Sequence, residues 1–221
     1  MSRIIQASLA VLALATVSAG ALGQAAPPRR TISITYQDLT GTQPPSSSAW
    51  VSHADGVHLW ALGQKADFAL KRLAEEGNPE LIVADAMFDP KRRFADQAIG
   101  LIALPGAQRT LTLQVDAEHP LVSGVWMLGM TNDAFAGIDA VDAYRLTEPV
   151  TIEVYALDAG TRKNSERQPY TVALGGTDDD PEDGVIARHS GIRGDADIPA
   201  SFKFDPSRPV ARVTITPALE R

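Results

Sequence analysis

Hydrophobic and polar residues alternate along four separate stretches of the chain, 30–37, 108–116, 150–157 and 209–216. A period of two residues is typical of antiparallel strands that bury one face and expose the other. The four stretches are therefore predicted to be half-buried strands. Their inward-facing residues are Ile32, Ile34 and Tyr36; Leu111, Leu113 and Val115; Val150, Ile152, Val154 and Ala156; and Ala211, Val213 and Ile215.

Other segments depart from this alternation. Residues 121–130 are apolar on both faces, which predicts a strand deep in the sheet. From Asp67 to Glu76 the apolar residues follow helical spacing, and Gly77 stands where a helix favours a left-handed cap. Residues 79–87 predict a second short helix, and the acidic, glycine-containing stretch 177–194 predicts a long loop. The predicted fold is all-β, an antiparallel β-sandwich with one or two short helices in an early connection.

The amino-terminal segment has the pattern of a secretory signal peptide. Arg3 precedes an apolar run from Ile4 to Val17, and small residues follow it. We expect residues 1–25 to be the signal, 26–30 a short linker and 31–221 a single domain that is secreted or periplasmic. An uncleaved membrane anchor is the alternative. The run is short for a membrane span, which needs roughly 20 apolar residues.

Charge and cysteine content narrow the classes of partner. The chain has 20 basic and 27 acidic residues and a net charge of −7. Removal of Arg3 with the signal makes the net charge −8, which disfavours nucleic acid and favours a divalent cation. Because the chain has no cysteine, it must fold without disulfides, thiolate zinc sites or a thiol nucleophile. This pattern suits a bacterial exported protein, which we expect to be a monomer.

Aspartates stand among apolar residues in the stretch 131–144, where an unpaired charge costs several kcal/mol to desolvate. Asp158 follows another predicted strand and so lies at a sheet end, where loops gather. If the loop around 132–139 reaches that same end, its oxygens and those of Asp158 suit calcium, which takes roughly six to eight oxygen ligands. Spacing alone equally allows Asp133 and Asp158 to be turn formers that bind backbone amides two residues on.

Seven segments, in order, resemble the spondin-N domain, the amino-terminal module of F-spondin and mindin, which also occurs as stand-alone exported bacterial proteins. No one of them is decisive, but their order is hard to obtain by chance. The segments are GTQPPSS (41–47), VSHADGVHLWALGQKA (51–66), LAEEGN (73–78), TNDAFAGID (131–139), YALDAGT (155–161), HSGIRGDAD (189–197) and PVARVTIT (209–216).

This resemblance implies an antiparallel β-sandwich with a bound calcium ion, and adhesion or recognition of an unknown protein or glycan ligand rather than catalysis. It matches Asp133 and Asp158 to acids of the family motifs and Asp139 to a further acid, so Asp133 and Asp158 are expected to be the main calcium ligands and Asp139 the third, while Asn132, Asn164 and a backbone carbonyl are expected to complete the shell. Two departures stand out. Arg162 replaces an acid that often follows Asp-Ala-Gly-Thr, which predicts a lower calcium affinity, and the paired cysteines of animal members are missing.

Other clusters carry weaker hypotheses. The acidic run from Asp178 to Asp183 does not fit a helix-loop-helix calcium loop, and we interpret it as solvated. Ser52, His53 and Asp55 include the residue types of a hydrolase triad, but adjacency in sequence gives no geometry. The alternative function is an exported metal-assisted hydrolase that uses His53, His189 and the Asp cluster. Arg193-Gly194-Asp195 matches a tripeptide that integrins read, and the simpler interpretation is a turn capped by Asp195 or Asp197.

Overall fold

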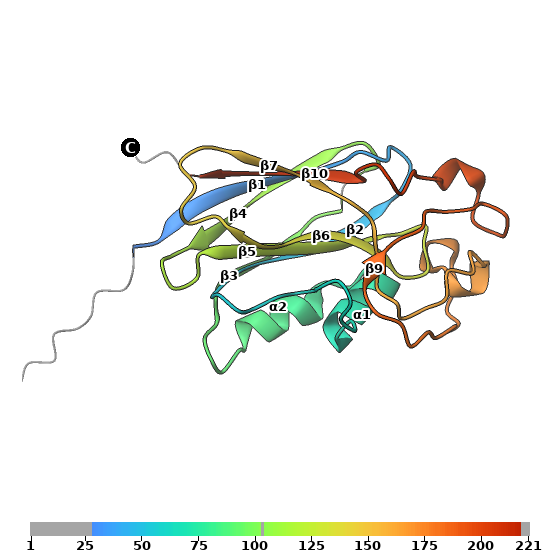
Figure 1. The fold of residues 1–221 in the computed structure, drawn as a ribbon, viewed down its shortest axis with the longest axis horizontal. Coiled ribbons are helices and arrows are strands. Elements are labelled where there is room, and N and C mark those ends of the chain that lie inside the picture. The colour runs from blue at the N-terminus through green and yellow to red at the C-terminus, as the bar shows by residue number, and fades with distance from the viewer. Residues whose placement is uncertain (1–27, 103, 218–221) are drawn as a thin grey trace, which may run out of the picture.

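The computed structural model describes residues 28–102 and 104–217, which form two antiparallel sheets packed face to face (Figure 1). The first sheet has the strand order β4-β1-β10-β7, and the second has the order β3-β2-β5-β6-β8-β9. The predicted β-sandwich is therefore confirmed. The strands are β1 (Arg30–Asp38), β2 (Pro45–His53), β3 (Phe94–Gly100), β4 (Gln108–Val115), β5 (Leu121–Leu128), β6 (Ala134–Asp142), β7 (Val150–Val154), β8 (Leu157–Asp158), β9 (Ala187–Arg188) and β10 (Ala211–Pro217).

Two helices, α1 (Phe68–Glu76) and α2 (Glu80–Met87), cover the outer face of the second sheet (Figure 1). Asp67 caps α1 by accepting a hydrogen bond from the Leu70 N–H, and Gly77 ends it in the left-handed conformation with φ 69°. Both predicted helices are confirmed. Three short 3-10 helices, Gln168–Tyr170, Val172–Leu174 and Ala200–Phe202, lie in the long connections.

Whether a sheet is covered on one face or on both explains which strands show alternating apolar and polar residues in the sequence. The first sheet packs on one face only, so β1 buries Ile32, Ile34 and Tyr36 and exposes or half-exposes the residues between them. The second sheet packs on both faces. Trp126 of β5 faces the first sheet while Val125 faces the helices, because each belongs to a different one of the two apolar clusters.

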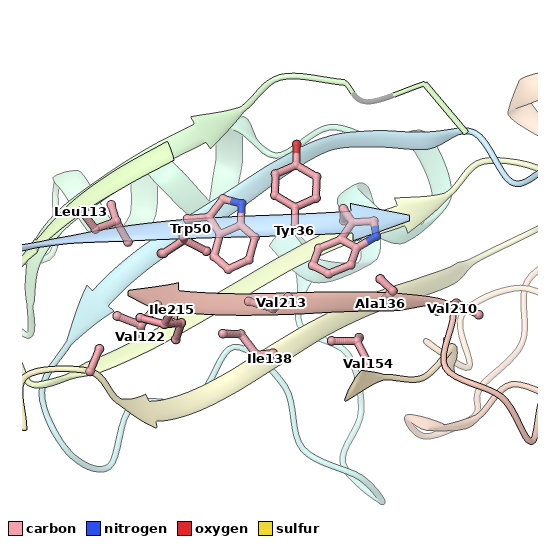
Figure 2. Close-up of a cluster of buried hydrophobic side chains, with 14 of the residues drawn as sticks. Tyr36, Trp50, Leu113, Val122, Ala136, Ile138, Val154, Val210, Val213 and Ile215 are labelled. Carbon is pink, nitrogen blue, oxygen red and sulfur yellow. The ribbon is translucent and has the colours of Figure 1, made fainter. Parts of the chain in front are cut away.

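Three aromatic rings occupy the centre of the space between the sheets. Tyr36, Trp50 and Trp126 lie with ring centroids 5.6–5.9 Å apart, and none is more than 2% exposed. Figure 2 shows Tyr36 and Trp50 among side chains from both sheets. Gly124 of β5 makes room for this cluster, since a Cβ there would lie 2.1 Å from the Trp50 ring.

The structure corrects the expected loop around 132–139. Residues 134–142 form strand β6, which pairs with β5 along most of its length and with β8 at Ala134 and Phe135. Its two faces are both apolar because the sheet is covered on both sides, so no alternation marks it in the sequence. The predicted signal, 1–25, lies outside the described residues. Within the described residues, no helix is long and apolar enough to cross a membrane.

Candidate metal centre

The pairing of β6 with β8 brings Asp133 and Asp158 together. Asp133 immediately precedes β6, and Asp158 is opposite Ala134 in the ladder. The Asp133 carbonyl also accepts a hydrogen bond from the Ala159 N–H at 3.3 Å. Two carboxylates that are 25 residues apart in the chain are thus neighbours at one end of the second sheet.

The Asp133 carboxylate is fully buried and unevenly hydrogen-bonded. Its Oδ2 accepts the backbone N–H groups of Thr161 at 2.8 Å and Arg162 at 2.9 Å, together with the Thr161 hydroxyl at 3.2 Å. Its Oδ1 is buried and has no hydrogen-bond partner among residues 28–102 and 104–217. A buried carboxylate oxygen without a partner is costly, and a bound cation is one way in which proteins satisfy such an atom.

Electrostatics point in the same direction. Burial and, to a smaller extent, the nearby negative charge of Asp158 together raise the pKa of Asp133 to about 7, against the opposing effect of hydrogen bonds from Arg162 and Thr161. In the absence of a cation the two carboxylates therefore resist being ionised together. A cation beside Oδ1 would reverse this effect by favouring the charged form.

Asp158 is held by a chain of hydrogen bonds that ends at a buried histidine. Its Oδ1 accepts the Gly160 N–H at 2.7 Å, and its Oδ2 accepts a hydrogen bond from the Asn164 side-chain amide. The Asn164 side-chain oxygen then accepts from His189 Nε2 at 3.1 Å, and His189 Nδ1 accepts the Gly191 N–H at 3.0 Å. These contacts assign a neutral Nε2–H tautomer, and burial lowers the pKa of His189 accordingly.

The structure does not bring Asp139 to these two aspartates. Asp139 lies five positions after Ala134 in β6, and an extended chain rises roughly 3.3 Å per residue. The Asp139 carboxylate instead accepts hydrogen bonds from the Leu59 N–H at 2.8 Å and the Ser123 hydroxyl at 3.0 Å, and it pairs with His58 Nδ1 at 2.5 Å. Asp139 therefore belongs to a different polar cluster.

The other expected ligand groups are only partly free. Asn132 uses its side-chain oxygen to accept the Glu166 N–H at 3.1 Å and its amide nitrogen to donate to the Tyr170 carbonyl. Arg162, at the position where an acid was expected, lies 3.5 Å from Glu75 and 3.3 Å from Asp179 through its Nε. These pairs partly offset its positive charge beside the two aspartates.

The donor set fits a hard, oxygen-seeking cation better than a soft one. No group of three or more His, Cys, Asp or Glu side chains in residues 28–102 and 104–217 is arranged to hold a metal ion. Calcium, however, also takes backbone carbonyls and water, so two carboxylates are a sufficient anchor. The unpartnered Oδ1 of Asp133 is the observation that makes the residues fit.

The histidines named for a hydrolase lie in separate clusters. His53 Nε2 lies 2.8 Å from the Ser123 hydroxyl, and burial lowers the pKa of His53. Its sequence neighbours are engaged elsewhere, because Ser52 donates to the Gln114 carbonyl at 2.7 Å and Asp55 accepts the Gly56 N–H. These contacts do not form the relay of nucleophile, base and orienting acid that a triad requires.

Sequence reasoning missed Glu166, which organises the loop that contains Arg193-Gly194-Asp195. Glu166 is 4% exposed and has φ 57°, and its carboxylate accepts the N–H groups of Arg193 and Gly194, each at 2.6 Å. The chain bends at residues 195–198, but neither expected aspartate caps this segment: Glu166 accepts the two N–H groups, Asp195 pairs with Arg193 at 3.3 Å, and Asp197 accepts the Gln168 N–H at 2.9 Å. A positive φ at a glutamate is a backbone property that the sequence does not reveal.

The family model described as Spondin_N matches residues 44–173, which is more than half of the 221-residue chain. The chain therefore belongs to the spondin-N family, whose members are a non-enzymatic kind of module and are typically extracellular. The matched range contains Asp133, Asp139 and Asp158. Among the curated proteins, none matches this sequence.

Proposed function

We propose that this chain is an exported recognition or adhesion module of spondin-N type that binds one calcium ion through Asp133 and Asp158. The single observation that carries the proposal is the buried, unpartnered Oδ1 of Asp133 beside a second carboxylate. Backbone carbonyls and water would supply the remaining oxygens. When bound, the ion contributes charge neutralisation at this sheet end and no catalytic step.

The residues around the pair support a structural role for the ion. Asp133 joins the start of β6 to the turn at Thr161 and Arg162, and Asp158 joins β8 to Asn164. A cation shared by the two carboxylates would bind the loops after β8 to the sheet. We infer that calcium orders the loop end of the sandwich, where sandwich domains commonly carry their ligand-binding residues.

The test is the melting temperature of the purified domain in millimolar calcium and in chelator. A ligand that binds only the native state stabilises it by RT ln(1 + [L]/Kd), so calcium at about 100 times its Kd adds roughly 2.7 kcal/mol. We expect Asp133→Asn and Asp158→Asn to remove the shift and Asp139→Asn to keep it. Equal melting temperatures with and without calcium for the wild type would contradict the proposal.

Metal analysis separates this function from the hydrolase alternative. We expect calcium and no zinc in the protein after exposure to both, because the paired carboxylates offer oxygen ligands only. Zinc bound through His53 or His189 would favour the hydrolase instead. The two histidines belong to different hydrogen-bonded clusters, which gives that alternative no support.

A further inference from the structure

The edge strands on the two lateral sides of the sandwich differ in whether their outer backbone groups have partners. On one side the edge strands β3 and β4 are joined across the sheets. Asp96 of β3 accepts the Gln114 N–H at 2.8 Å, and Ser52 of β2 donates to the Gln114 carbonyl at 2.7 Å. Side chains of the second sheet therefore satisfy the outer backbone groups of β4 at this point.

The opposite side has two strand edges without partners. β7 ends the first sheet, and within the described residues no strand pairs with its outer edge. Beyond Phe135, β6 likewise has no strand on the side where β8 pairs with its beginning. The β7 sequence, VTIEV, contains none of the prolines or lysines with which proteins commonly protect exposed edges.

A pocket lies between these two edges. Its volume is about 240 Å³, and its walls come from β6, β7, β8 and the segment before α1. A cavity of about 150 Å³ already admits a benzene-sized group, so this one has room for a bulky apolar side chain. The apolar residues that line it are Leu62, Ile138, Val141, Ile152, Val154 and Leu157.

One cation at the pocket has no acidic partner among the described residues. Arg188 lies over the Tyr155 ring at 4.3 Å and, within the described part of the chain, forms no ion pair. A stacked guanidinium is oriented to bind a carboxylate. The two acids at the pocket are already paired, Asp139 with His58 and Glu153 with Arg212.

We propose that this open side binds an extended, acidic peptide segment of a partner protein, which adds to β7 as a further strand. A bulky apolar side chain of the segment enters the pocket, and a neighbouring Asp or Glu side chain binds Arg188. Such strand addition draws its affinity from backbone hydrogen bonds and its specificity from pockets for alternate side chains. This proposal rests on the proposed function in one respect, that the chain is a recognition module. It does not involve the calcium site.

The test uses a displayed library of random linear nine-residue peptides, selected on the folded wild-type domain. We expect enriched peptides to combine an apolar residue with an acidic one. Synthetic copies should bind Arg188→Glu and Leu62→Ser at least about five-fold more weakly than wild type. Matched controls are Arg92→Glu and Leu101→Ser, exposed residues that do not line the pocket, which should leave the affinity unchanged.

Amide hydrogen exchange supplies a readout that is specific to strand addition. The bound peptide should slow exchange of β7 amides, with no comparable change in β4. The proposal is overturned if no peptide is enriched, if basic peptides are enriched, if both pocket variants bind like wild type, or if β7 exchange is unchanged on binding. Affinities are measured in calcium and in chelator, so that a failure of the calcium site is seen separately.

Discussion

Asp158 lies beside Asp133 because β8 pairs with the first two residues of β6, and its charge helps to raise the pKa of Asp133 to about 7. The short ladder between β6 and β8 thus places two carboxylates close together inside the protein, where they repel each other when both are ionised. One oxygen of Asp133 is already occupied by three donors, and the other has none. The expected behaviour of the domain without metal follows from this arrangement.

The contribution of Asp133 to the stability of the metal-free protein should fall as the pH rises, while the buried His53 and His189, whose pKa values burial lowers, contribute in the opposite direction. The pKa of Asp133 is about 7 in the folded state, against 3.8 for an unburied aspartate, so the folded state retains a proton that the unfolded chain releases between these values. Raising the pH through this window lowers the free energy of unfolding by at most about 4 kcal/mol, and no further loss from this group follows above it. Urea unfolding of wild type and Asp133→Asn at pH 5 and pH 8 in chelator isolates this contribution, and because pH 5 already lies inside the window, the expected loss from Asp133 over this range is at most about 3 kcal/mol.

Asp133→Asn should flatten that pH dependence and stabilise the metal-free protein at pH 8, because it removes the buried charge while keeping an acceptor for the Thr161 and Arg162 N–H groups. We expect a gain on the order of 1–3 kcal/mol. The control is Asp183→Asn, an exposed acid in the loop before β9, which should change the free energy of unfolding by less than about 0.5 kcal/mol. An unchanged pH profile in the Asp133 variant would refute the assignment of this window to Asp133.

Asn164→Ala should weaken calcium binding without removing either carboxylate. The variant loses the amide that fixes Asp158 and leaves the buried His189 Nε2–H without its acceptor. Loss of such an outer contact typically weakens metal affinity by about 10- to 100-fold. A calcium titration followed by tryptophan fluorescence or calorimetry gives the Kd. Wild-type affinity in this variant would show that Asp158 needs no such support.

Ser123→Ala should destabilise the fold independently of calcium. The Ser123 hydroxyl contacts His53 Nε2 at 2.8 Å and Asp139 at 3.0 Å, and it accepts the Ala140 N–H at 2.8 Å. Its loss leaves several buried polar groups without partners, at a cost of about 2–3 kcal/mol. Denaturant unfolding measures this loss, and the calcium-induced shift in melting temperature should remain as in wild type.

Gly124→Ala should destabilise the domain more than Gly56→Ala. A Cβ at Gly124 would lie 2.1–2.5 Å from three atoms of the Trp50 ring, whereas one at Gly56 meets nothing within 4 Å and is penalised only by a φ of 74°. We expect a cost of about 3 kcal/mol at Gly124 and about 1 kcal/mol at Gly56. Similar costs at the two positions would contradict the tight contact with Trp50.

The first sheet could be predicted from sequence because solvent covers its outer face. Burial at Ile32, Ile34 and Tyr36 between exposed or half-exposed neighbours leaves a clear period of two. The sequence did not predict strands β2, β3 and β6. Helices and the first sheet cover both faces of β2 and β6, so these strands show no alternation of polar and apolar residues. In β3 most residues are half-buried, which also removes the alternation. The helices were predictable because Asp67 and Gly77 mark the ends of α1 in the sequence.

The candidate site was predictable only in part, because the sequence pattern did not reveal strand β6. Asp133 and Asp158 could be paired by their positions next to a predicted strand and within family motifs. Asp139 was grouped with them because residues 132–139 were expected to be a loop, and a strand instead carries it away. The roles of Asn164 and Glu166 depend on long-range contacts and a positive φ, neither of which leaves a local pattern.

The most direct test of the account is a calorimetric titration of calcium into the metal-free domain at pH 7.5, performed on wild type, Asp133→Asn and Asp139→Asn. The account predicts one calcium per wild-type chain, no binding to Asp133→Asn and binding retained in Asp139→Asn. Absence of binding to wild type at millimolar calcium, or equal binding to wild type and Asp133→Asn, would contradict it.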